Sequence, residues 1–247
     1  MYKIVLSKHF QSFEPFLINI QSYFSVNNES IHKARNELKI ISYNDQKTVV
    51  KSFKRPNLLR SFIYTFLRDS KAKKSFDNCL RLKDFTPKPI GYIEFYQNSF
   101  LSTSYFVSEK FDYDFTIREP LLDNTFENRN EVFQEFAKFT FELHQANILH
   151  LDYSPGNILI KKQNNSYIFK VVDVNRMDFR ELSLHERLQN FNKLWANDHD
   201  LSVMAQEYAK LTNEDENKCV EIACEFNNKH KNKMRLKHRL KGKKIND

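Results

Sequence analysis

The first half of the chain alternates hydrophobic and polar residues over short stretches, which is the pattern of half-buried β-strands. In one such stretch Val49, Lys51 and Phe53 fall on the same face of a strand. The predicted strands span residues 2–6, 36–42, 48–53, 90–96 and 100–107. Apolar residues at helical spacing predict helices between these strands, over residues 11–24, 57–67 and 71–82.

The second half has a mainly helical pattern. Between residues 131 and 145 the apolar side chains recur every three to four positions, which predicts a long amphipathic helix. Two apolar runs, at residues 157–161 and 167–172, predict a pair of strands joined by a polar turn. Further helices are predicted over residues 180–194, over residues 199–211, and from residue 214 onward.

Strands come first and helices follow, and this order favours an α+β fold with two lobes. We expect a small antiparallel-sheet N-lobe at residues 1–108, which includes an N-terminal strand and helix as an extension. A mainly helical C-lobe is expected at residues 109–228, with a basic tail at residues 229–247. A cleft is expected near residues 107–113, where the two patterns meet.

Composition favours a folded core and narrows the functional classes. Hydrophobic residues make up 40% of the 247 residues and aromatic residues 14%, which argues against wholesale disorder. The three cysteines are odd in number and lack zinc-type spacing, so we expect free thiols in a reducing cytosol. No apolar stretch is long enough for a signal peptide or a membrane span, which favours a cytoplasmic protein. With three glycines in all, a glycine-rich phosphate loop is not expected.

Positive charge is concentrated in the last residues of the sequence. Residues 229–247 hold nine Lys and Arg and one acid, Asp247, whereas the other residues hold 30 basic and 30 acidic side chains. Such a segment is attracted to an anionic membrane surface by about 1 kcal/mol for each cation near the surface. A solvated basic end is the alternative. Nucleic acid is not an expected partner, because the segment lacks interleaved aromatic residues for base stacking.

The most informative stretch is HLDYSPGN at residues 150–157, which leads into an apolar strand. Phosphoryl transfer from ATP uses such a set: a carboxylate accepts the proton of the attacking hydroxyl, and an amide oxygen binds the metal. We therefore predict Asp152 as the base and Asn157 as a metal ligand. His150 is predicted to organise the loop through hydrogen bonds, and Gly156 to permit a tight turn. An ordinary polar loop before a strand is the alternative.

Asp173 lies sixteen residues after Asn157, at the end of the second strand of this pair. A carboxylate at the end of a buried strand needs a cation or a set of hydrogen-bond donors. We predict that Asp173 and Asn157 together hold Mg²⁺, and a turn cap is the alternative role of Asp173. Asn175 and Arg176 follow closely enough to contact phosphate or substrate.

Lys51 is a cation in an apolar strand. A lysine in this position faces inward only if an anion is present, because burying an unpaired ammonium group costs free energy. The functional interpretation is a clamp for the phosphates of ATP, and the alternative is an edge-strand lysine in solvent. The helix that follows offers Asp77 as a partner carboxylate, and a solvated surface acid is the alternative interpretation of Asp77.

Several segments together resemble the lipopolysaccharide core kinases, the Kdo/heptose kinase family within the protein-kinase-like superfamily. The resemblance covers roughly residues 30–211. The segments that carry it are ARN (34–36), VVKSFKRP (49–56), SKAKKSF (70–76), TPKPIG (86–91) and DVNRM (173–177). The resemblance implies a protein-kinase-like bilobal fold, with ATP and Mg²⁺ as cofactors.

The resemblance also implies roles for individual residues. Lys51 would hold the ATP phosphates and pair with Asp77. Asp152 would be the catalytic base, while Asn157 and Asp173 would bind Mg²⁺. The other implied nucleotide contacts are Arg35, Asn36, Glu109, Phe111 and Leu159. The backbone of the hinge that runs from Glu109 to Phe111 would read the adenine edge, and Leu159 would form part of the adenine floor.

The sequence departs from the family pattern at several positions. Asp77 stands where the family usually has a glutamate, which is one methylene longer, and Ala34 stands where a glycine is expected. Val174 and Asn175 replace the phenylalanine and glycine that usually follow the metal-binding aspartate. No obvious peptide-docking segment follows Asp173, which argues for a non-protein substrate.

The function implied is an ATP-dependent kinase that phosphorylates a sugar hydroxyl, on Kdo or heptose, of the lipopolysaccharide inner core. Its partners would be the lipid A core acceptor and, through residues 229–247, the anionic cytoplasmic face of the inner membrane. A kinase-fold phosphotransferase for another small molecule or a protein is one alternative, and a non-catalytic nucleotide-binding module is another. The set of Lys51, Asp152, Asn157 and Asp173 argues against the module, since nucleotide binding alone needs no proton-accepting aspartate.

Overall fold

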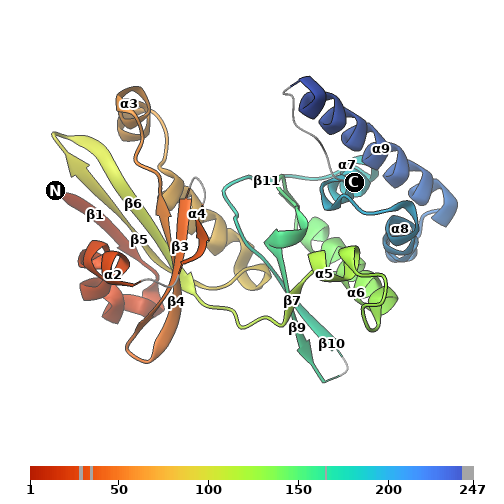
Figure 1. Cartoon of the computed structure of the whole chain (residues 1–247), viewed down its shortest axis with the longest axis horizontal. Helices are drawn as coiled ribbons and strands as arrows, with labels where there is room; N and C mark the ends of the chain where they lie inside the picture. The colour runs from red at the N-terminus through yellow and green to blue at the C-terminus, as the bar shows by residue number, and fades with distance from the viewer. Residues whose placement is uncertain (28–29, 34–35, 165, 241–247) are drawn as a thin grey trace. The chain divides into compact units, whose positions relative to one another are not determined.

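In the computed structural model the chain divides into two compact units, Met1–Asp112 and Tyr113–Asp247 (Figure 1). The structure describes residues 1–27, 30–33, 36–164 and 166–240. The boundary follows Asp112 instead of residue 108, because strand β6 (Phe100–Glu109) runs past that point. The next residue is still tied to the sheet, since Lys110 N–H donates to the carbonyl of Lys47 at 3.0 Å. The predicted cleft stays a prediction.

The first unit contains a six-stranded antiparallel sheet in the order β1-β5-β6-β4-β3-β2. Besides β6, its strands are β1 (Tyr2–Leu6), β2 (Ser30–Lys33), β3 (Asn36–Tyr43), β4 (Gln46–Phe53) and β5 (Pro89–Gln97). The β3–β4 hairpin turns through Asn44 and Asp45, both in the left-handed backbone region that such tight turns require. All five strands predicted in this half are present, and β2 is additional.

Alternation along the strands gives this sheet two different faces. Lys51 on β4 lies opposite Phe106 on β6, which lies opposite Tyr92 on β5, so these three side chains share one face. Phe76 of α4 (Lys71–Leu82) packs on Tyr92, with ring centroids 5.5 Å apart, so α4 covers the face that carries Lys51. The residues of the other face join the N-terminal helices in one apolar core, whose buried sheet members are Ile41, Val50, Ile90, Ile93, Tyr105 and Val107.

The prediction of one continuous helix over residues 11–24 is wrong. The structure has η1 (Lys8–Phe13), α1 (Glu14–Ile18) and α2 (Ile20–Val26), with a break at Asn19. The side chain of Asn19 donates to the carbonyl of Pro15 at 2.9 Å, and this local bond competes with helix propagation. Because the chain turns at Asn19, both short helices bury their apolar residues against the same sheet face.

The other helices of the first unit agree with the prediction within a few residues. They are α3 (Leu58–Phe66), α4 and η2 (Lys83–Phe85). Ser70 is the N-cap of α4, and its hydroxyl oxygen accepts a hydrogen bond from Lys73 N–H at 3.1 Å.

The second unit contains helices packed beside two small sheets. Its elements are β7 (Phe115–Thr116), α5 (Arg118–Leu122), α6 (Arg129–Gln145), β8 (Ile148–His150), η3 (Pro155–Asn157), β9 (Ile158–Gln163), β10 (Ser166–Val171), β11 (Met177–Phe179), α7 (Leu184–Gln189), η4 (Asn190–Leu194), α8 (Asp198–Thr212) and α9 (Glu216–Leu240). β10, β9 and β7 form one antiparallel sheet, and β11 pairs with β8. The apolar stripe of α6 is buried as its periodicity predicts, with Val132, Phe133 and Phe136 fully inside.

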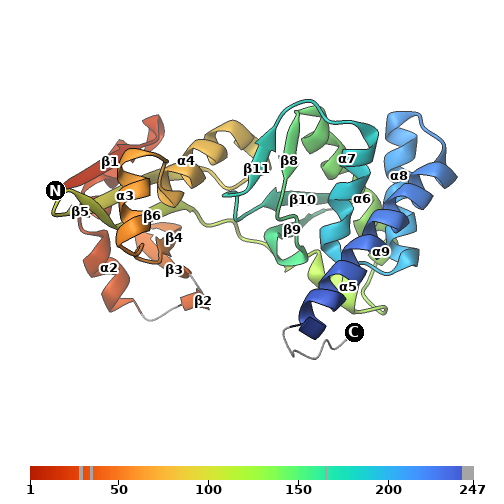
Figure 2. The same ribbon diagram turned by 90° about the horizontal axis from the view of Figure 1, so that it is seen from above.

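Two predictions for the end of the chain need correction. The predicted helix over residues 180–194 begins only at Leu184, because Ser183 and Glu186 form a reciprocal capping box that starts α7 there. No boundary separates residue 228 from residue 229, since α9 runs through it and packs against α7 and α8 (Figure 2). Residues 241–247 of the predicted tail lie outside the described residues. None of the described helices is both long and apolar enough to cross a membrane.

Candidate functional site

His150 lies at the centre of the loop that carries the predicted base. It is fully buried at the end of β8. Asp152 N–H donates to His150 Nδ1 at 3.1 Å, and His150 Nε2 lies 3.0 Å from the carbonyl oxygen of Val172. A carbonyl oxygen can only accept, so Nε2 carries the proton and Nδ1 is the acceptor. Burial lowers the pKa of His150, which favours this neutral form. His150 therefore organises the loop, as predicted from the sequence.

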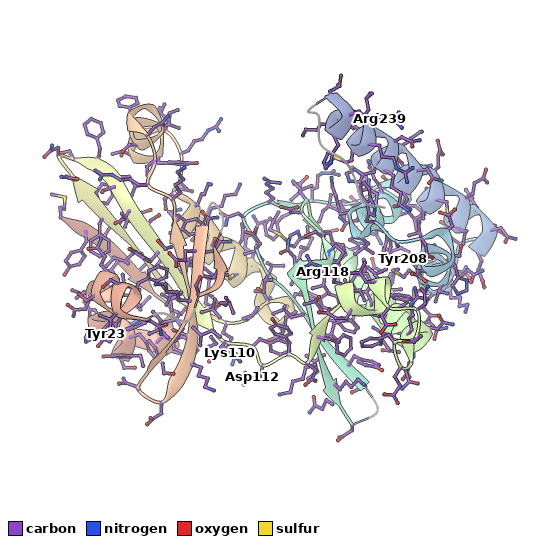
Figure 3. The ribbon with its side chains drawn as sticks, in the orientation of Figure 1. Tyr23, Lys110, Asp112, Arg118, Tyr208 and Arg239 are labelled. Atoms are coloured by element: carbon purple, nitrogen blue, oxygen red, sulfur yellow. The ribbon has the colours of Figure 1, made fainter. Side chains whose placement is uncertain are left out.

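A chain of buried hydrogen bonds fixes the position of His150. Asn190 Nδ2 donates to the carbonyl of His150 at 3.0 Å, and Asn190 Oδ1 lies 3.1 Å from His144 Nε2. The other ring nitrogen of His144 lies 2.9 Å from the hydroxyl of Tyr208, which is labelled in Figure 3. Burial lowers the pKa of His144 to about 4, so its ring is neutral at ordinary pH. Helices α6 and α8 thus fix the position of the loop through side chains that the sequence analysis did not identify.

Asp152 and Asn157 are joined directly. The side-chain nitrogen Nδ2 of Asn157 donates to the backbone carbonyl of Asp152 at 2.9 Å. That bond uses the amide nitrogen, and Asn157 Oδ1 makes no hydrogen bond within the described residues. The amide oxygen is the atom type that binds hard cations. The Asp152 side chain is about one-third exposed, at 35%, so its carboxylate is accessible.

Asp173 is held next to the same loop through its neighbour. Val172 N–H donates to the carbonyl of Asn157 at 2.9 Å, and the carbonyl of Val172 accepts from His150. Asp173 itself is exposed and has a left-handed backbone, with φ of 53°. A non-glycine residue in that region needs local support, and such residues cluster at functional sites. The structure therefore gathers the loop of Asp152 and Asn157 and the residue before Asp173 into one hydrogen-bonded assembly.

Arg176 contacts the predicted base. Its Nη1 lies 3.2 Å from Oδ2 of Asp152, and both side chains are open to solvent. The backbone fixes this pairing, because Leu151 N–H donates to the carbonyl of Arg176 at 2.9 Å and Met177 pairs with His150 in the β8–β11 ladder. The sequence indicated that Arg176 could contact phosphate or substrate, but not that it would meet Asp152.

The structural reason for a glycine at position 156 differs from the tight turn that was predicted. It has no left-handed backbone, and the loop passes it as part of η3. A Cβ at this position would instead lie 2.8 Å from Nη2 of Arg118. Glycine therefore leaves room for a guanidinium that packs on the loop. No signal in the sequence links Arg118 to Gly156, because the contact depends on where α5 begins.

Lys51 is buried, with 8% of its surface exposed, on the sheet face covered by α4. Its Nζ lies 5.5 Å from the centre of the Phe53 ring. The position is close enough to Cys79 of α4 for the ammonium charge to oppose the burial that raises the pKa of that thiol to about 12. The prediction that Lys51 faces inward is confirmed, whereas its contact with phosphate stays a prediction.

Asp77 is engaged by another lysine. Its Oδ2 lies 2.8 Å from Nζ of Lys73, and the same ammonium lies 3.0 Å from Asp69 Oδ2. These hydrogen bonds raise the pKa of Lys73 well above its ordinary value. Pairs one helical turn apart form readily on a helix surface, and Lys73 is the cation one turn before Asp77. The pairing of Asp77 with Lys51 stays a prediction.

Part of the predicted hinge is already hydrogen-bonded within the sheet. Glu109 N–H donates to the carbonyl of Lys88 at 2.9 Å, and Glu109 Oε1 accepts from Gln46 at 2.6 Å. Glu109 therefore lacks a free N–H for adenine. The N–H of Phe111, in contrast, makes no hydrogen bond within the described residues. Contact between the predicted hinge and adenine stays a prediction.

The remaining predicted nucleotide contacts are less well defined. Leu159 is half-buried on β9, and its neighbours Ile158 and Ile160 point into the core from the opposite face. It therefore presents an apolar surface on the side away from the core, as an adenine floor requires. Asn36 begins β3 opposite Phe53, with its side-chain oxygen buried. Arg35 lies outside the described residues.

The oxygen ligands of the second unit fit Mg²⁺ better than a transition metal. Among the described residues no group of three or more His, Cys, Asp and Glu side chains is placed to hold a metal. Mg²⁺ does not need such a cage, because it keeps several waters and is bound through one or two protein oxygens together with phosphate. One amide oxygen, from Asn157, and one exposed carboxylate, from Asp173, match that requirement.

Comparison with known proteins identifies the fold. No protein-family model matches the sequence, and no curated protein matches it. Among solved structures, WaaP in its complex with acyl carrier protein is similar over 93% of this chain and 98% of that chain. The two have 12% sequence identity and a TM-score of 0.59. The predicted α+β, protein-kinase-like bilobal fold is confirmed.

Proposed function

We propose that this protein is an ATP-dependent kinase that phosphorylates a sugar hydroxyl, on Kdo or heptose, of the lipopolysaccharide inner core. The observation that carries the proposal is the hydrogen-bonded assembly of the loop of Asp152 and Asn157 with the residue before Asp173. The segments that resemble the lipopolysaccharide core kinases support the substrate class. The likeness to WaaP supports the fold that the proposal requires.

In the proposed reaction the acceptor hydroxyl oxygen forms a bond to the γ-phosphorus of ATP. The bond from that phosphorus to the oxygen bridging the β- and γ-phosphates breaks, and ADP leaves. The proton of the hydroxyl passes to the carboxylate of Asp152, which His150 and Asn157 hold in position through its own backbone.

Several residues would balance the charge on the phosphates. Asn157 and Asp173 would hold Mg²⁺, which neutralises phosphate oxygens when it is bound. Lys51 would contact the nucleotide phosphates from the first unit, where its ammonium is already desolvated. Phe111 N–H and Leu159 would bind the adenine ring.

Transfer of labelled γ-phosphate tests the proposal directly. Purified full-length protein is incubated with Mg-ATP and either Kdo–lipid A or a heptose-bearing core, alongside the Asp152→Asn variant. Transfer to one acceptor that is lost in the variant supports the kinase, its acceptor and its base together. Transfer to neither acceptor while ATP binds contradicts the proposed substrate class. Failure to bind ATP contradicts the kinase and favours a non-catalytic interaction module.

The cations of the last turns of α9 support a further part of the proposal, attraction to an anionic surface. The described residues 229–240 carry six of them, among which Lys233, Lys237 and Arg239 are exposed. Arg239 is labelled in Figure 3. The lipid-linked acceptor makes an anionic cytoplasmic leaflet the proposed surface. Acyl carrier protein, the partner in the WaaP structure, is a second candidate.

The binding experiment must spare the packing of α9. Lys231 donates to the carbonyl of Ala196 at 2.7 Å, and His230 packs on Trp195, so deleting the segment would disturb the fold. We would therefore change Lys233, Lys237 and Arg239 to Gln and measure sedimentation with vesicles containing anionic lipid. We expect the variant to bind the vesicles more weakly than wild type, and high salt to weaken the binding of wild type as well. Equal binding of both proteins would rule out the membrane interaction, and purified acyl carrier protein provides the parallel measurement.

A further inference from the structure

The loop that carries Asp152 has no cation of its own. Between His150 and Asn157 its one acidic or basic side chain is that of Asp152. Positive charge reaches it from Arg176, whose Nη1 lies 3.2 Å from Asp152 Oδ2. A guanidinium has five N–H donors in a fixed fork, so one bond to Asp152 leaves donors for a second anion. The side chain of Arg176 is 65% exposed, so a ligand can reach it.

A second guanidinium packs on the same loop at Gly156. The position of a Cβ there would lie 2.8 Å from Nη2 and 3.4 Å from Cζ of Arg118. Arg118 is exposed, and within the described residues its guanidinium makes no hydrogen bond or ion pair. Its charge is therefore compensated by solvent alone, at Gly156 of the loop that also carries the predicted base.

The backbone of Arg118 is fixed by its neighbours. Ile117 is fully buried, and its N–H donates to the carbonyl of Ile158 at 3.2 Å, which ties the start of α5 to β9. The adjacent acid, Glu119, is already used, because its Oε2 accepts from the N–H and hydroxyl of Thr116 at 2.9 and 2.6 Å. The same fold that places Asp152 thus presents Arg118 without an acidic partner.

We propose that Arg118 and Arg176 form an anion-binding subsite for the acceptor. The subsite recognises a carboxylate or phosphate group near the hydroxyl that is phosphorylated, and this inference rests on the proposed function. Guanidinium groups bind both anions through paired hydrogen bonds. Gly156 adjoins the subsite, because a Cβ there would lie 2.8 Å from Nη2 of Arg118 and the guanidinium would have to shift.

Steady-state kinetics test the subsite. Arg118→Gln and Arg176→Gln are each expected to raise KM for Kdo–lipid A about tenfold, the cost of losing a hydrogen bond to a charged group. KM for ATP is expected to stay within about twofold. Arg118→Lys keeps the charge and should recover part of the loss. Lys210→Gln removes an exposed cation of the same unit on α8 and is the matched control.

Modified acceptors identify the anion. One has its Kdo carboxylate methylated, and the other has lipid A without phosphates. The modification that removes the recognised group should raise the KM of wild type for the acceptor. With that modified acceptor, Arg118→Gln should raise KM little further. If the substitution and the modification raise KM additively with both modified acceptors, the arginines recognise neither anion and the subsite is wrong. A rise in KM for ATP instead of the acceptor would reassign both arginines to the nucleotide.

Binding without turnover separates this proposal from the proposed function. Titration of Kdo–lipid A into protein without ATP is expected to show affinity about tenfold weaker for Arg118→Gln than for wild type. If that difference appears but no phosphate is transferred, the subsite stands and the proposed reaction fails. If phosphate is transferred and both variants keep the wild-type KM for acceptor, the reaction stands and the subsite is wrong. Absence of acceptor binding by wild type overturns both. Thermal unfolding of each variant checks that it is folded.

Discussion

The two units hold their predicted catalytic residues in opposite ways. In the second unit Asp152 and Asn157 are neighbours along the chain, bonded to each other and fastened by a fully buried histidine. In the first unit Lys51 comes from a strand and Asp77 from a helix, and the acid is held by Lys73 instead. One region is a short loop with a rigid support, and the other depends on the packing of separate elements.

The difference shows where spacing in a sequence is a sufficient guide. A five-residue separation within one loop limits the geometry, so Asp152 and Asn157 were found from the sequence. A lysine on a strand and an acid on the following helix have many ways to meet or miss each other. The helix surface supplies a competing partner at one turn, and local geometry favours that partner.

The largest effect is expected from Asp152→Asn. The variant keeps the shape of the side chain but cannot accept the hydroxyl proton, so turnover should fall about a thousandfold. ATP affinity should stay near wild type, because the loop is held through the backbone of Asp152. Single-turnover phosphate transfer and calorimetric titration of ATP provide the two measurements. Unchanged turnover would remove Asp152 as the base.

The buried support of the second unit should make its stability depend on pH. Burial lowers the pKa of His144 from 6.5 to about 4, so the unfolded chain binds a proton that the folded chain excludes. The contribution of neutral His144 to the free energy of unfolding is therefore complete above pH 6.5. It is lost as the pH falls towards 4, which lowers the free energy of unfolding by on the order of 3 kcal/mol. Denaturant unfolding followed by fluorescence of Trp195, the one tryptophan, reports this unit. His144→Gln should reduce the dependence, and the contribution of His150, whose pKa burial also lowers, should remain. An unchanged slope would contradict the assignment.

Breaking the same support at Asn190 should be nearly as costly. Asn190→Ala leaves the carbonyl of His150 and Nε2 of His144 without their partner, which should lower the free energy of unfolding by about 2 kcal/mol. Asn232 is exposed on α9, and Asn232→Ala should change it by less than about 0.5 kcal/mol. Denaturant titration of the three proteins at neutral pH makes the comparison, and equal values for the variants would argue against a supporting role.

The smallest effect tests the first unit. If Asp77 serves Lys51 during catalysis, Asp77→Ala should lower kcat/KM for ATP about tenfold, equivalent to about 1.4 kcal/mol. Lys73→Ala should change that value less than about twofold, since it removes only the competing cation. Either change should cost a few tenths of a kcal/mol in stability, as expected for an exposed helix pair. Equal kinetic constants for the two variants would restrict Asp77 to the surface pair.

Local features account for most of what sequence reasoning predicted in the fold. The strand alternation around Lys51 and the helical rhythm of α6 each require one buried face, so the elements and their orientation followed directly. The break at Asn19 and the late start of α7 were missed, because they depend on local side-chain hydrogen bonds of Asn19 and of the Ser183–Glu186 capping box. Short strands such as β7 and β8 depend on partners far along the chain and have no periodicity of their own.

The α+β class, the proximity of Asp152 and Asn157 in one loop, and the inward direction of Lys51 could all be predicted from the amino-acid sequence. Spacing within a few residues and the cost of burying polar groups limit these features without reference to distant residues. The packed fold was needed to show that Tyr208, His144 and Asn190 support the loop, that Asp77 meets Lys73, and that Arg118 packs on Gly156. Each of those contacts joins side chains from separate elements, so its geometry exists only once the elements have packed.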